Sequence, residues 1–183
     1  MPLNQWIFWS FLPAAVGLLW HCFSAPSLPV RFLNLAFFLL CLEQARMATL
    51  DLQRIQLANP LEPSRPLRRF RRVTLVTIGL ELLGFYSAVV WLTAGAVWVL
   101  ASLIFFNSFA SVQIDPEGTL ATRPLSDRLP ILAADGISLL LVSLWHLQIA
   151  PLGISLTLVA LIALDGGIKY GPLVLSRLSA LRW

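Results

Sequence analysis

The chain has 183 residues, of which 58% are hydrophobic and 12% are charged. Soluble domains carry about 25% charged residues, so a soluble fold could not cover this much apolar surface with polar groups. The formal net charge of +4 would suit a nucleic-acid partner, but the arginines gather at the ends of apolar runs, as the positive-inside rule of membrane proteins predicts, so no nucleic-acid partner is expected.

The first apolar run covers residues 6–23 and predicts a transmembrane helix that the mature protein retains. No Lys or Arg precedes this run, whereas signal peptides begin with a basic segment. Pro26 also follows the one small-residue cleavage point that the region offers. Both features argue against a signal peptide.

A second span is predicted over residues 31–50, and its helix is expected to continue into the cytoplasm to residue 58. Glu43 and Arg46 support this extension, because side chains three positions apart can pair along a helix. The prolines and arginines of residues 59–72 then predict an extended cytoplasmic linker, since a residue before proline avoids the helical region.

The next apolar region covers residues 73–114 without a break. As one helix it would be about 63 Å long, twice the thickness of a bilayer core, so it must fold back on itself. We expect spans over 73–91 and 96–114. The sequence Asp115-Pro116-Glu117-Gly118 is typical of a type I turn, and its apolar flanks are compatible with a small β-hairpin.

Two further spans are predicted over residues 131–149 and 154–170, joined by a turn at 151–153. Residues 1–183 therefore form a single integral membrane domain. The predicted fold is all-α, a polytopic helical membrane protein with six transmembrane helices in three hairpins and both termini cytoplasmic.

The orientation follows from the cluster Arg65–Arg72, because positive charge resists translocation and stays on the cytoplasmic side. Alternation from this cluster places the N-terminus, residues 44–72, residues 115–130 and the C-terminus inside. These segments hold most of the basic residues, whereas the outer loops hold only Arg31. The predicted location is a bacterial inner membrane or a thylakoid-type membrane.

Three acids are candidates for a polar site within the membrane. Glu81 lies nine positions beyond Arg72, or about 14 Å deeper along a helix, while Asp135 and Asp165 are shallower. A site in the inner half of the bundle would suit a cation, a proton relay or a basic solute. Alternatively, Glu81 is protonated and bonded to a neighbouring helix, Asp165 pairs with Lys169, and Asp135 is interfacial.

His21 and His146 each follow a tryptophan and are expected at the outer boundary. Imidazoles on two helices at one depth could ligate a haem b or a chlorophyll-type magnesium. Alternatively, both belong to the ordinary Trp-rich belt at the headgroup level. No third ligand accompanies them, so no zinc or other metal site is predicted, and the cofactor, if any, is unknown.

The basic cluster is either a binding surface or a topology signal alone. As a surface it would contact the bilayer, through anionic lipid headgroups, or an acidic membrane-protein partner. The residues concerned are Arg65, Arg68, Arg69, Arg71 and Arg72.

The sequence offers no nucleophile with a histidine and an acid at the same depth, so we expect no enzyme. The leading functional hypothesis is a non-enzymatic membrane subunit or assembly factor of a membrane complex. It is based on the long second helix and on small residues in span four, such as Gly95 and Ala96, which suit close helix contacts. The alternatives are a small-solute or ion transporter component around Glu81, and a haem or chlorophyll protein.

Overall fold

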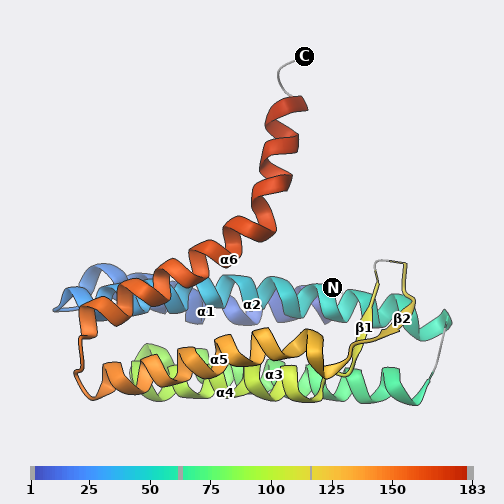
Figure 1. Ribbon diagram of the computed structural model, residues 1–183, viewed down its shortest axis with the longest axis horizontal. Helices are drawn as coiled ribbons and strands as arrows, with labels where there is room; N and C mark the ends of the chain where they lie inside the picture. Colours follow the sequence, from blue (N-terminus) through green and yellow to red (C-terminus); the bar gives the residue numbers. More distant parts are fainter. Residues whose placement is uncertain (1–2, 62–63, 116, 181–183) are drawn as a thin grey trace.

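The structure is a computed structural model that describes residues 3–61, 64–115 and 117–180. Within these ranges the chain forms six α-helices and one β-hairpin (Figure 1). The elements are α1 (Leu3–Ser24), α2 (Leu28–Leu61), α3 (Arg65–Val90), α4 (Leu92–Phe109), β1 (Val112–Ile114), β2 (Leu120–Thr122), α5 (Leu125–His146) and α6 (Pro151–Ala180). Each helix is long and apolar enough to cross a membrane, so the predicted all-α integral membrane architecture is confirmed to that extent.

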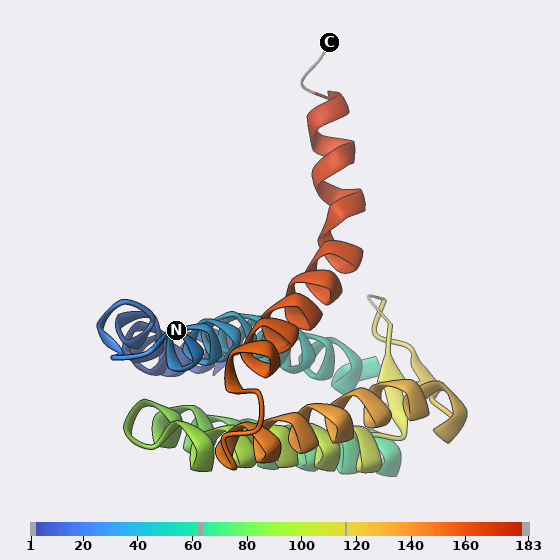
Figure 2. The same ribbon diagram turned by 60° about the vertical axis from the view of Figure 1, so that its left-hand side comes forward.

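The helices lie in two layers. In Figures 1 and 2, α1 and α2 form one layer, and α3, α4 and α5 form the other. Helix α2 packs against α1, α3 and α6, while α5 packs mainly against α4. The first two predicted hairpins, α1 with α2 and α3 with α4, are therefore closely packed pairs. The two helices of the third, α5 and α6, make only limited contact. Helix α6 crosses α2 and then bends away from the bundle (Figure 1).

The predicted extended linker over residues 59–72 is wrong for residues 65–72, which form the first turns of α3. Ser64 caps this helix, and its side chain accepts a hydrogen bond from the Leu67 N–H at 3.4 Å. Pro66 occupies the first turn, where its missing N–H costs nothing and its fixed φ suits a helix. Proline here starts a helix, and the linker is confined to a short connection of which residues 62–63 lie outside the described ranges.

Helix α4 ends at Phe109 rather than at residue 114, because the chain there enters β1. Strands β1 and β2 pair antiparallel, with Val112 opposite Thr122 and Ile114 opposite Leu120. The Gly118 N–H donates to the Asp115 carbonyl at 2.9 Å, and Gly118 has a φ of 85°. The β-hairpin that the sequence allowed is therefore present.

Helices α5 and α6 both begin earlier than predicted. Helix α5 begins at Leu125 and includes Pro130, at the cost of one backbone hydrogen bond. Helix α6 begins at Pro151, a position that proline favours. The turn between them consequently lies before residue 151, where Gln148 (φ 60°) and Ala150 (φ 44°) adopt left-handed conformations.

Helices α3 and α4 meet at a crossing that only glycine permits. A Cβ atom on Gly95 would lie 2.1 Å from the backbone nitrogen of Ala88, and one on Gly84 would lie 2.9 Å from that of Val99. Ala96 and Ser102 of α4 are also fully buried. Much of the small-residue surface of span four thus serves a contact within the chain, as small residues commonly do between membrane helices.

We predict that Gly95→Ala destabilises the protein by about 1–3 kcal/mol, because the added methyl group meets backbone atoms that cannot move aside. Gly79→Ala is the matched control, since a Cβ there meets nothing within 4 Å. The free energy of unfolding, measured by denaturant titration in mild detergent, checks the difference. Equal stabilities of the two variants would contradict the close crossing.

Candidate functional site

A stripe of buried polar side chains follows one face of α3. Thr74, Thr77 and Glu81 are 2%, 4% and 2% exposed. Their spacing of three and then four residues places them on the same side of the helix. They follow Arg72 by two, five and nine positions, so the stripe leads from the basic start of α3 to a depth of about 14 Å.

Helix α2, which packs against α3, carries two titratable side chains within electrostatic range of Glu81. The Glu81 carboxyl group interacts electrostatically with Cys41 and with Asp51, which lie ten positions apart on α2. Asp51 also interacts with Arg54, nearer the end of α2. Asp51 was not among the predicted site residues, because only the packing of α2 against α3 brings it toward Glu81.

The hydroxyl groups of the stripe lack hydrogen-bond partners. Hydroxyls elsewhere in the helices, such as those of Thr49 and Thr157, donate to the carbonyl four residues earlier at 2.8 and 2.9 Å. The Thr74 and Thr77 hydroxyls are buried and make no such bond to any described residue. No ion pair in the described part of the chain includes Glu81 either. Unsatisfied polar groups in an apolar interior are costly and indicate a site that can receive a polar ligand.

The other two predicted acids lie in separate clusters. Asp135 of α5 accepts a hydrogen bond from the Asn107 side-chain amide at 2.9 Å. Asp165 of α6 forms an ion pair with Lys169 at 2.6 Å, as the alternative interpretation expected. The three acids predicted together therefore belong to three different arrangements, and only Glu81 is without a partner of this kind.

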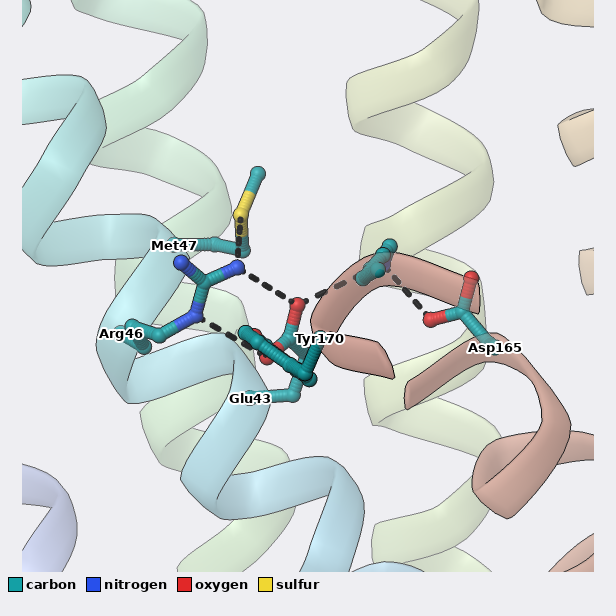
Figure 3. A network of polar contacts seen from close by, with 6 residues as sticks. Glu43, Arg46, Met47, Asp165 and Tyr170 are labelled. Atoms are coloured by element: carbon teal, nitrogen blue, oxygen red, sulfur yellow. Dashed lines mark hydrogen bonds and ion pairs between the residues drawn. The ribbon is translucent and has the colours of Figure 1, made fainter. Parts of the chain in front are cut away.

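A polar network joins α2 to α6 around Glu43 (Figure 3). Its carboxylate pairs with Arg46 at 3.1 Å and with Lys169 at 3.4 Å. The Tyr170 hydroxyl donates to the other carboxylate oxygen, and the Arg46 guanidinium lies 4.8 Å from the centre of the Tyr170 ring. The pairing of Glu43 with Arg46 was predicted. Tyr170 was missed because nothing in the sequence places α6 beside α2.

Arg128 and Asn107 connect α4 to α5. Arg128 is buried, and its Nη1 atom donates to the carbonyls of Asn107 and Ser108, each at 3.0 Å. A cation at these last carbonyls of α4 is favourable, because the helix dipole is negative there. Residues 115–130 were expected on the cytoplasmic side of the membrane, and the sequence carries no signal for the burial of Arg128 among them.

The two histidines lie in the last turns of α1 and α5. Both turns are at the end of the bundle where α1 passes into α2 and α5 into α6 (Figure 1). His21 is half-buried and His146 is exposed. Among the described residues no three His, Cys, Asp or Glu side chains are grouped to hold a metal ion. Haem or chlorophyll ligation by this pair stays a prediction.

Comparison with models of protein families, with curated proteins and with solved structures gives no match for this chain. Its function is therefore inferred from the geometry of the buried stripe and of the basic cluster.

We predict that Glu43→Gln loosens α6, lowering the free energy of unfolding by about 1–3 kcal/mol, because the charged partner of Arg46 and Lys169 is lost. Asp165→Asn is the control, and it should cost less than about 1 kcal/mol because Asp165 is 56% exposed. Denaturant titration, with hydrogen exchange of the α6 amides, measures both. An equal loss in the two variants would show that Glu43 does not anchor α6.

Proposed function

We propose that the chain is a membrane-embedded proton-transport component in which Glu81 takes up and releases a proton. The observation that carries this proposal is a buried carboxyl group with two unpartnered hydroxyl groups on the same helix face. Ionisable side chains within membrane spans are rare because of their cost, and they mark ion pathways and proton relays.

The chemistry of the stripe suits a proton path. A hydroxyl group both donates and accepts hydrogen bonds, so water molecules held by Thr74 and Thr77 would connect Glu81 to the basic start of α3. Asp51 of α2 offers a second carboxyl group within electrostatic range of Glu81. Protonation from the cytoplasmic side forms an O–H bond on Glu81 and makes it neutral. Net transport then requires that this O–H bond breaks and that the proton leaves toward the opposite face of the membrane.

We propose a cytoplasmic location for both termini and for the start of α3, in a bacterial inner membrane or a thylakoid-type membrane. Arg31 lies at the start of α2, whereas the cluster Arg65–Arg72 lies at the opposite end of the bundle, near the β-hairpin (Figure 1). The positive-inside rule then assigns the latter end to the cytoplasm. In this orientation the polar stripe leads from the cytoplasmic surface toward the middle of the membrane.

A second candidate is a non-enzymatic subunit or assembly factor of a membrane complex. It is favoured by α6, whose last turns leave the bundle in both views (Figures 1 and 2). A partner helix could cover that segment. Isolation in mild detergent tests this role: a co-purifying membrane protein that is lost with an α6 truncation at Tyr170 supports it, and migration of the chain alone contradicts it. Neither candidate role requires an enzymatic step.

The proton role predicts that Glu81→Gln abolishes proton flux. Purified protein is placed in liposomes that contain a pH-sensitive dye, and a potassium diffusion potential drives proton entry. We expect wild-type flux at least about tenfold above that of Glu81→Gln, because an amide cannot bind and release the proton. Thr77→Val should give an intermediate flux, since it removes one hydroxyl group of the stripe.

Glu117→Gln is the matched control, because it makes the same chemical change at an exposed position of the β-hairpin turn. Its flux should equal that of the wild type. A wild-type flux no greater than that of empty liposomes, or a Glu81→Gln flux equal to the control, would contradict the proton role.

A further inference from the structure

Four arginines line one pocket at the start of α3. Arg65, Arg68, Arg69 and Arg72 recur with spacings of three, one and three residues, which places them on one helix face. All four are exposed, and the pocket that they line has a volume of about 420 Å³. Arg71, the fifth arginine of the cluster, does not line it.

Among the described residues, no acidic side chain pairs with the arginines of this pocket. The ion pairs of the described residues involve Arg46 and Lys169, and none includes an arginine of the pocket. Like charges that face a shared space repel one another, and the partial positive charge at the N-terminus of α3 adds to the repulsion. An anion in the pocket would therefore stabilise this arrangement.

The position of the pocket identifies the kind of anion. Arg72 is followed directly by Val73 and by the apolar part of α3, so the arginines lie at the boundary of the membrane-spanning segment. The phosphate groups of lipids occupy this level of a bilayer. Guanidinium groups also present a planar pair of donors that matches two phosphate oxygens, which a single ammonium group cannot do.

We infer that this pocket binds the phosphate of an anionic phospholipid, held by Arg65, Arg68, Arg69 and Arg72. The hydrophobic span that begins at Val73 would lie beside the acyl chains of the same lipid. This inference is independent of the role of Glu81, which lies farther along the helix. It also differs from a topology signal, for which any five positive charges would serve.

Binding of phosphatidylglycerol to the purified full-length protein tests the inference. Native mass spectrometry in detergent, with phosphatidylcholine as the neutral reference, measures the apparent dissociation constants. We expect Arg68→Gln/Arg69→Gln to weaken phosphatidylglycerol binding at least about tenfold, because charge-assisted contacts to the phosphate are lost. Arg71→Gln/Arg123→Gln removes the same charge outside the pocket, and its affinity should stay within about twofold of the wild type.

The fourfold variant Arg65→Lys/Arg68→Lys/Arg69→Lys/Arg72→Lys separates the geometry of the guanidinium groups from their charge. It keeps the positive charge that insertion requires, so it remains informative if the glutamine variant fails to insert. The inference predicts weaker phosphatidylglycerol binding for this variant, because the paired donors are lost. Wild-type affinity in the lysine variant would overturn a site built on guanidinium geometry.

Two further results would overturn the inference. One is an equal affinity for phosphatidylglycerol and phosphatidylcholine, or an equal loss in the pocket and control variants, which would indicate diffuse attraction only. The other is displacement of phosphatidylglycerol by inorganic phosphate at a similar concentration, with the same sensitivity to Arg68→Gln/Arg69→Gln. That result would assign the pocket to a soluble phosphate instead of a lipid.

Discussion

The cost of moving charge into hydrocarbon shapes every part of this molecule. Large apolar side chains cover its surface, including Phe23 and Val90, which are 74% and 90% exposed. Exposing such a surface to water would cost free energy, whereas contact with the acyl chains of lipid does not. In the proposed orientation, the cost of moving charge into hydrocarbon holds the arginines of α3 at a boundary and so gives each apolar helix a direction. The fold and the proposed orientation thus both depend on the low polarity of the bilayer core.

Within this solvent, the protein treats its internal polar groups in three ways. Glu43 is neutralised by cations from its own helix and from α6. Arg128 donates to the carbonyls that end α4 and so links two elements. The Thr74 and Thr77 hydroxyls are buried without hydrogen-bond partners, and no ion pair of the described residues includes the buried Glu81. The first two arrangements stabilise helix contacts, and the third has no evident structural use, which is why we associate it with function.

Apolar runs alone predicted the number of helices, because each span must be about 20 residues long to cross the hydrocarbon core. The turn at Asp115–Gly118 and the break near Trp91 were predicted for equally local reasons. Helix starts were predicted less well. At Arg65 the proline that follows was interpreted as part of an extended linker, although proline in a first turn is compatible with a helix. The start at Leu125 was missed because the span was predicted from the apolar run that begins at residue 131, and a membrane helix can include a proline such as Pro130.

Contacts between distant segments could not be predicted from sequence. The Tyr170–Glu43 bond and the approach of Asp51 to Glu81 depend on which helices are neighbours, and one sequence does not specify this. Helix α6 also packs against α2 more extensively than against α5, so the predicted third hairpin is not a closely packed pair. Pairs that are close in the sequence, such as Asp165 and Lys169, could be predicted, because a helix places residues four positions apart side by side.

Site-directed thiol labelling tests the proposed threading of the membrane most directly. In a background with Cys22→Ala and Cys41→Ala, one cysteine is placed at Ser27, between α1 and α2, or at Glu117, in the β-hairpin, both of them exposed positions. A membrane-impermeant maleimide should label Ser27→Cys in intact cells, and Glu117→Cys only after the membrane is permeabilised. Labelling of Glu117→Cys in intact cells, with Ser27→Cys protected, would contradict the cytoplasmic location of the arginine cluster.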